Sequence, residues 1–282
     1  MRSARWHLGW FTVIATLAFL VPVIGTTVLE LQHDLYLLIY FTITLAVLGV
    51  YATRAGVDVG ARLRRYWPAS LALGALLAVF VVRNLLDGAS TPHPDGVYFA
   101  FELVWRGVIY GIVDATLLSA FPALVAFALV RSDVHGIGRK LVFGAGTLVL
   151  SAVITATYHL GYEQFQNDRV ATPVGGNVAM SIPAIITTNP IGSLAVHPTM
   201  HVAAIIHEYE GDTYLPPATP GYEQRFAGTA AWALAVGWAA MASVALTLLR
   251  RRARRAPLTE TQAPTPRAGP RRADEPTTAR IS

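Results

Sequence analysis

Long apolar stretches separated by short polar clusters run through the whole chain. A membrane span takes about 20 mostly apolar residues, and six stretches approach or exceed that length: 8–28, 35–51, 68–86, 98–130, 141–160 and 226–249. A further stretch, 178–207, is apolar but interrupted. The pattern predicts an all-α, polytopic transmembrane helix bundle with about six to eight membrane segments.

The interrupted stretch is expected to fold as a broken or re-entrant hairpin. Pro183 and the run 187–190 (Thr-Thr-Asn-Pro) lie at its middle, and neither half crosses a core of about 30 Å comfortably at 1.5 Å per residue. Irregular backbone at membrane depth is tolerated where protein buries it or where it lines a wet cavity. The alternative is one irregular, tilted span.

Composition narrows the class of protein. Only 14% of the 282 residues are charged, 54% are hydrophobic and the mean hydropathy is +0.46, whereas soluble domains are about a quarter charged. The net charge of +5 is therefore a topology signal, and the partner expected is the lipid bilayer and not a nucleic acid. Without cysteine, a disulfide framework and a thiolate metal site are excluded.

Basic residues near span ends mark the cytoplasmic side. Arg2 and Arg5 place the N-terminus inside, and the arginine-rich run 250–255 places the C-terminus there too. We therefore expect a multi-pass cell-membrane protein with a transmembrane domain over 1–249. The Arg- and Pro-rich segment 250–282 has almost no large apolar residue and is expected to be a disordered cytoplasmic tail.

Several ionisable residues lie inside the predicted spans, where a charge costs at least about 2.5–3.5 kcal/mol and suggests a functional site. Glu102 and Arg106 are four residues apart, so they can pair on one helix face. Glu102, His159 and His201 are expected near the outer third of the membrane on three different segments, which a shared cavity would explain. The remaining candidates are Asp114, His197 and His207.

Each candidate also has a purely structural interpretation. The Glu102–Arg106 pair can be a neutralised ion pair that holds helices together. His159 can be an interfacial residue, and Asp114 can bond a neighbouring backbone group or hydroxyl.

The run Glu102-Leu-Val-Trp-Arg106-Gly107, with His159 on the next span and His197 four residues before His201, resembles the motifs of the CPBP family, the CAAX-prenyl-protease-like intramembrane proteases. The resemblance covers roughly 98–207. Phe101 stands where that family has its first glutamate, and Thr155 where a phenylalanine usually precedes the motif histidine.

The resemblance implies a glutamic-type intramembrane peptidase that acts on a membrane protein or peptide. A buried carboxylate suits a base near neutral pH, so Glu102, kept ionised by Arg106, would activate a water molecule, and His159 would share that water or shuttle its proton. His197 or His201 would donate to the oxyanion. This chemistry needs no cofactor, although His159, His201 and His207 could bind a metal.

Two alternatives remain open. The chain can be an inactive relative of the family, a pseudoprotease that serves as a membrane scaffold. It can also be a metal- or haem-binding protein or a transporter, since transporters place broken helices at their binding sites.

Overall fold

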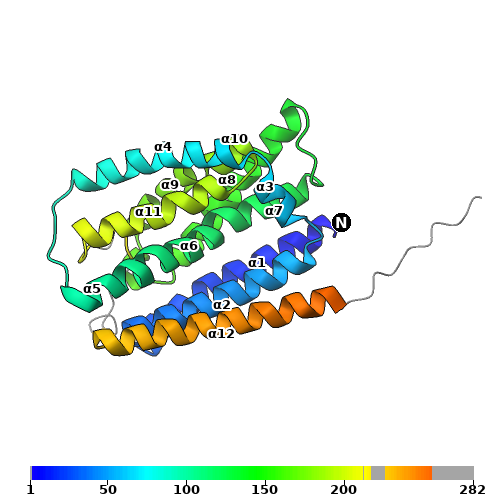
Figure 1. Ribbon diagram of the computed structural model, residues 1–282. Coiled ribbons are helices and arrows are strands. Elements are labelled where there is room, and N and C mark those ends of the chain that lie inside the picture. Colours follow the sequence, from blue (N-terminus) through cyan, green and yellow to red (C-terminus); the bar gives the residue numbers. More distant parts are fainter. Residues whose placement is uncertain (1, 212, 217–225, 256–282) are drawn as a thin grey trace, which may run out of the picture. The chain divides into compact units, whose positions relative to one another are not determined.

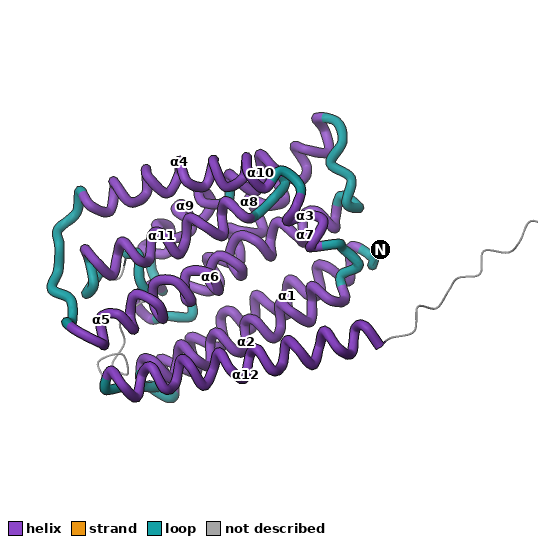
Figure 2. The backbone as a smooth tube through the Cα atoms, in the orientation of Figure 1, coloured by secondary structure: helices purple, strands orange, loops and turns teal. Residues whose placement is uncertain are grey.

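The computed structural model describes residues 2–211, 213–216 and 226–255, which contain helices and no strand (Figure 2). The chain divides into two units, Met1–Trp238 and Ala239–Ser282. Within the second unit, the described residues continue helix α12 to Arg255; the predicted tail beyond that point lies outside the described residues.

The helices, in chain order, are α1 (Ala4–Pro22), α2 (His33–Arg54), α3 (Val59–Arg64), α4 (Trp67–Leu86), α5 (Gly96–Glu102), α6 (Tyr110–Ala115), α7 (Phe121–Leu129), α8 (Ile137–His159), α9 (Ala171–Met180), α10 (Ile182–Thr187), α11 (Ile191–His207) and α12 (Gly228–Arg255). Seven helical segments of the described residues are long and apolar enough to cross a membrane. The predicted all-α polytopic bundle is confirmed.

The segment predicted over 98–130 is a single helical run from Gly96 to Leu129 and the most buried of the seven. Two π-helical segments, Leu103–Ile109 and Thr116–Ala120, separate α5, α6 and α7. Each adds a residue to the turn and so changes which side chains face the neighbouring helices. Glu102, Arg106 and Asp114 all lie on this run.

The broken segment is present, and its break falls at 188–190 as the sequence predicts. Thr188 adopts a left-handed conformation with φ of 58° at the end of α10, and α11 then starts at Ile191. The first arm is longer than expected, because helix already begins within 161–176, and Asp168–Thr187 has the length of a span. The apolar pattern does not predict this part of the arm, because it contains the adjacent Gly175 and Gly176 and has a lower hydropathy than the other spans.

The tip of this hairpin is fastened to the start of α4. The side-chain amide of Asn189 donates to the backbone oxygens of Leu63 and Arg65 at 2.9 and 2.7 Å, and the Ser70 hydroxyl donates to the Asn189 carbonyl at 2.6 Å. Beyond it, α4 and α11 lie side by side (Figure 1). A Cβ on Gly74 would come within 2.5 Å of the Gly192 carbonyl oxygen, so small residues allow this close approach.

Candidate functional site

The close approach of α6 and α11 builds the site. A Cβ on Gly111 would lie 2.5 Å from the Cα of Pro198, so α6 approaches α11 here as only glycine permits. Asp114 follows Gly111 by about one turn, and His197 and His201 flank Pro198. The glycine therefore brings a carboxylate and two imidazoles face to face.

Asp114 faces His197 and His201 of α11. Its Oδ2 is 3.7 Å from Nε2 of His201 and 4.0 Å from Nε2 of His197. Asp114 is 5% exposed and His201 3%. Within the described residues, Oδ1 of Asp114 and Nε2 of His201 have no hydrogen-bond partner, and such groups are costly when buried.

The hydrogen bonds of His201 define its tautomer. Nδ1 lies 2.5 Å from the carbonyl oxygen of Tyr214, and because a carbonyl only accepts, Nδ1 carries the proton. In the neutral ring, Nε2 is then an acceptor that faces a second acceptor, the Asp114 carboxylate. A proton or a water molecule is needed between them.

His197 is held more tightly. Its Nδ1 lies 3.1 Å from the Ser193 carbonyl and its Nε2 3.1 Å from Oδ1 of Asn177. The Asn177 amide is fixed in turn, because its nitrogen donates to Ser151 and Thr155 hydroxyls, each at 2.7 Å. Both partners of His197 are oxygen acceptors, so the neutral ring donates to one of them and only the imidazolium donates to both. The two contacts nevertheless place the ring beside Asp114.

A cavity of about 270 Å³ opens beside these residues. Asp114, His197 and His201 line it together with His159 of α8 and Tyr110 of α6. Nδ1 of His159 is bound to the Thr155 carbonyl at 2.8 Å, and the Tyr110 ring packs edge-on against His201 with centroids 4.8 Å apart. The lining also includes Asn84, Thr172, Asn177, Met180 and Tyr214. This mixed polar and apolar lining is typical of ligand sites.

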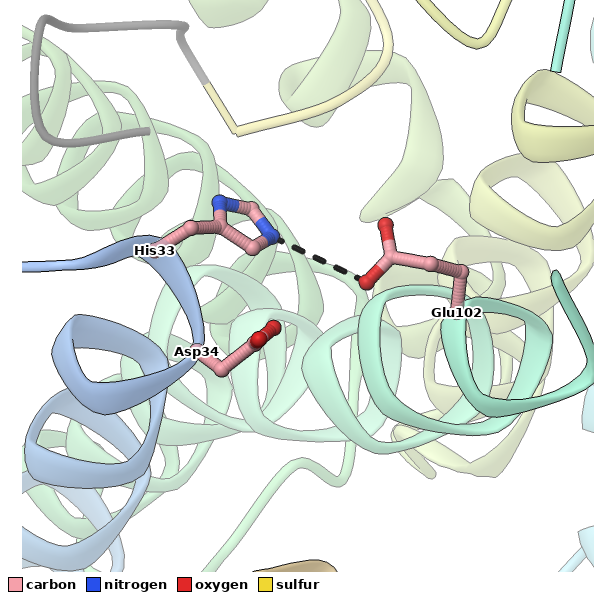
Figure 3. Close-up of side chains that lie close together, drawn as sticks. All are labelled: His33, Asp34 and Glu102. Atoms are coloured by element: carbon pink, nitrogen blue, oxygen red, sulfur yellow. Dashed lines mark ion pairs between the residues drawn. The ribbon is translucent and has the colours of Figure 1, made fainter. Parts of the chain in front are cut away.

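Glu102 belongs to a separate cluster and does not line this cavity. Arg106 donates to its Oε2 at 3.1 Å and Tyr209 at 3.2 Å. His33, at the start of α2, faces the other oxygen with Nε2 3.9 Å from Oε1, beside Asp34 (Figure 3). Asp114 is twelve residues further along the same helical run, about 18 Å at 1.5 Å per residue.

The Glu102 cluster is the group of described residues whose geometry could hold a metal ion. One ligand atom from each of His33, Asp34 and Glu102 lies within 4.8 Å of the others, and all three residues are buried. The ligand set predicted from His159, His201 and His207 is not gathered among the described residues: Nε2 of His207 is 3.1 Å from the Gly88 carbonyl.

The structure thus brings together three predicted residues, His159, His197 and His201, and places Glu102 with Arg106 as the i,i+4 spacing predicts. The central role of Asp114 and the contribution of Asn177 and Tyr110 were not predicted. Asp114 could have been found by its spacing from Gly111, two residues that face α11 together. Asn177 directly precedes the interrupted apolar stretch 178–207, so the sequence assigns it to no membrane segment.

The helical fold of the described residues and its seven candidate membrane spans are those of a multi-pass membrane protein, and a cavity with polar and apolar lining lies beside α6 and α11. No model of a protein family, no curated protein and no solved structure matches the chain. The CPBP resemblance therefore stands on the motif residues alone.

Proposed function

We propose that this protein is an intramembrane peptidase in which Asp114 and His201 activate a water molecule. The observation that carries the proposal is the pair itself, a carboxylate and an imidazole nitrogen that face each other at 3.7 Å beside a cavity, each with an atom lacking a hydrogen bond. Water between two acceptors donates to both, which is the arrangement that a general base requires. The motif resemblance supports a peptide bond as the target.

The path of the proton follows from the tautomer of His201, because Nε2 of the neutral ring is the nitrogen that can accept it. The water oxygen attacks the peptide carbonyl carbon while one proton passes to Nε2, and the imidazolium that forms is stabilised by the Asp114 carboxylate. The proton then passes to the peptide nitrogen as the carbon–nitrogen bond breaks. The Tyr214 carbonyl, bound to Nδ1, holds the ring in the orientation that this transfer needs.

His159 supplies the second polar function. It lines the cavity from another helix, and its Nδ1 is tied to the backbone, so its Nε2 is the atom left for substrate. Because the proton of the neutral ring lies on Nδ1, Nε2 is an acceptor and takes a hydrogen bond from the attacking water. His197, held by Asn177 and Ser193, borders the Asp114 carboxylate, with Nε2 4.0 Å from Oδ2. The predicted role of Glu102 as the base stays a prediction that the variants below test.

The experiment compares the wild type with Asp114→Asn, reconstituted in vesicles and incubated with a pool of peptides and single-span membrane proteins. Asp87→Asn is the matched control, because Asp87 carries the same group at the exposed end of α4. We expect cleavage by the wild type and the control and its loss in Asp114→Asn. Cleavage at the wild-type rate by a folded Asp114→Asn protein would contradict the proposal.

A second candidate function, metal binding, is favoured by the Glu102 cluster. Two carboxylates and one guanidinium leave one negative charge in a buried site, which a bound cation or a positive charge on His33 would balance. Nitrogen and oxygen ligands from His33, Asp34 and Glu102 suit Zn²⁺ or Mn²⁺. Elemental analysis of the purified protein tests this candidate: a stoichiometric metal that disappears in His33→Ala supports it, and an equal content in both proteins excludes this site.

A further inference from the structure

A second large cavity, of about 410 Å³, lies where three membrane segments end. It is bordered by the first residues of α4, the first turn of α8 and the last turn of α10. Arg65, Tyr66, Lys140, Ile186 and Thr188 are the lining residues that decide its chemistry. None of the described residues that line it is acidic.

The cavity is electropositive. Arg65 and Lys140 are exposed, and neither forms an ion pair with a carboxylate in the described ranges. Asp133 does not line the cavity, but it binds a residue that does: its Oδ1 lies 2.8 Å from Nδ1 of His135, and its other oxygen pairs with Arg139. The charge of Asp133 is therefore compensated by Arg139, and among the described residues Arg65 and Lys140 remain uncompensated. The hydrogen bond and charge of Arg65, aided more weakly by Lys140, lower the pKa of the Tyr66 phenol.

A third cation lies behind the lining. Buried Arg62 donates to the Thr188 hydroxyl at 2.7 Å, and its guanidinium packs 3.4 Å from the centroid of the Phe127 ring. Burial, helped by the charge of Arg65, lowers the pKa of Arg62 to about 10, so it remains positive at neutral pH.

Two helix N-termini add to this charge. The helices α4 and α8, 20 and 23 residues long, begin at the cavity, and no side chain caps the first backbone amides of either helix. Pro68, the second residue of α4, has no N–H, so α8 supplies the fuller set of free amides. Such amides and the positive ends of the helix dipoles favour phosphate groups.

Apolar side chains beside the cations distinguish a lipid from a soluble anion. Ile186 lines the cavity and is 63% exposed, and Leu141, next to Lys140, is 66% exposed. Trp67, also exposed, opens α4 beside Arg65 and Tyr66, and tryptophan is enriched where membrane spans meet the headgroups. A phosphate bound at Arg65 and Lys140 would leave its acyl chains along these apolar residues.

We propose that this cavity binds the phosphate headgroup of an anionic phospholipid. Arg65, Lys140 and the amides of α4 and α8 hold the phosphate, and Ile186 and Leu141 contact the acyl chains. Basic pockets between transmembrane helices bind such headgroups elsewhere by the same electrostatics. Since Asn189 ties the hairpin tip to the backbone of Arg65, the lipid also stabilises the junction of α3, α4 and α10. This site is independent of the proposed peptidase activity.

The test measures binding to the purified full chain in a neutral detergent. The probes are dioctanoyl phosphatidate, dioctanoyl phosphatidylcholine and inorganic phosphate, and the readouts are the melting temperature and native mass spectrometry. The variant Arg65→Gln/Lys140→Gln removes both cations of the cavity. The control, Arg54→Gln/Arg64→Gln, removes two exposed arginines that precede α4 and do not line the cavity.

We expect the wild type and the control to bind phosphatidate and the Arg65/Lys140 variant to bind at least about tenfold more weakly. Because Arg65 and Lys140 are exposed, we expect the variant to fold normally. An equal melting temperature of variant and wild type without lipid verifies this. Ile186→Ser should weaken phosphatidate but not inorganic phosphate. The proposal would be overturned if the wild type bound phosphatidylcholine as tightly as phosphatidate, or if the control lost as much phosphatidate binding as the Arg65/Lys140 variant. It would also be overturned, in favour of a soluble phosphate ligand, if inorganic phosphate bound as tightly as phosphatidate.

Discussion

Glu102 and Asp114 are two buried acids on one helical run with opposite surroundings. Glu102 is fully buried and accepts from Arg106 and Tyr209, so most of its charge is compensated by fixed donors. Asp114 faces two histidines and lines a cavity. Each acid has one oxygen without a hydrogen-bond partner among the described residues, Oε1 of Glu102 and Oδ1 of Asp114, so the cavity beside Asp114 is what distinguishes them. The first acid is bound into a structural network, whereas the second has room for another molecule.

This difference shows why burial of a charge does not by itself identify a reactive group. A paired buried charge loses several kcal/mol of stability when its partner is removed, and its chemistry is quenched by the pairing. A buried charge with an unsatisfied atom and adjacent space has been left incompletely compensated, as functional groups often are. The four predictions below test the contrast, from the largest expected effect to the smallest.

The largest effect is expected for Asp114→Asn on cleavage. We expect the rate to fall by about 10²–10⁴-fold, the size of a general-base contribution, because an amide cannot stabilise the imidazolium that forms when His201 takes the proton. The comparison variant is Glu102→Gln, which leaves the residues of the cavity unchanged and should retain cleavage if folded. Both rates are measured in vesicles with equal amounts of folded protein. Loss in Glu102→Gln with retention in Asp114→Asn would instead assign the base to Glu102, as the motif resemblance implies.

Arg106→Met should have the largest effect on stability. It leaves the carboxylate of Glu102 buried without its guanidinium, which costs about 3–5 kcal/mol for a broken buried pair. Adding Glu102→Gln to this variant should recover part of the loss, since the orphaned charge is then gone. Unfolding in denaturant measures each variant. Additive effects of the two substitutions would show that the pair is not coupled.

The fold was predictable to a large extent, and the site only in part. Apolar stretches of span length and the Asn189-Pro190 break determine the helices and the turn, because both follow from local sequence. The division of the polar residues into two clusters does not follow from local sequence, because it depends on which faces of the helices meet. The π-segments at Leu103–Ile109 and Thr116–Ala120 shift those faces without any signal in the periodicity.

Gly111→Ala should affect both cleavage and stability, through the distance between α6 and α11. The added Cβ would overlap with Pro198 backbone atoms 2.5 Å away, so the helices must separate at a cost of about 1–3 kcal/mol. Asp114 then moves away from His201, and cleavage should fall more than the loss of folded protein explains. Gly9→Ala is the control, because nothing lies within 4 Å of its added Cβ. Unchanged cleavage in Gly111→Ala would show that cleavage does not depend on the close packing of α6 against α11.

The smallest effect is expected for Tyr209→Phe, which removes one donor from the Glu102 cluster. The hydroxyl lies 3.2 Å from Oε2 of Glu102, and a hydrogen bond to a charged group contributes about 1.5–3 kcal/mol. Because Arg106 still donates to the same oxygen, the loss should fall at the lower end, about 1–2 kcal/mol in denaturant unfolding. Cleavage per folded molecule should stay at the wild-type rate, since the cluster is remote from Asp114. A fall in cleavage without a fall in stability would mean that the two buried acids act as one site, and the contrast between them would be lost.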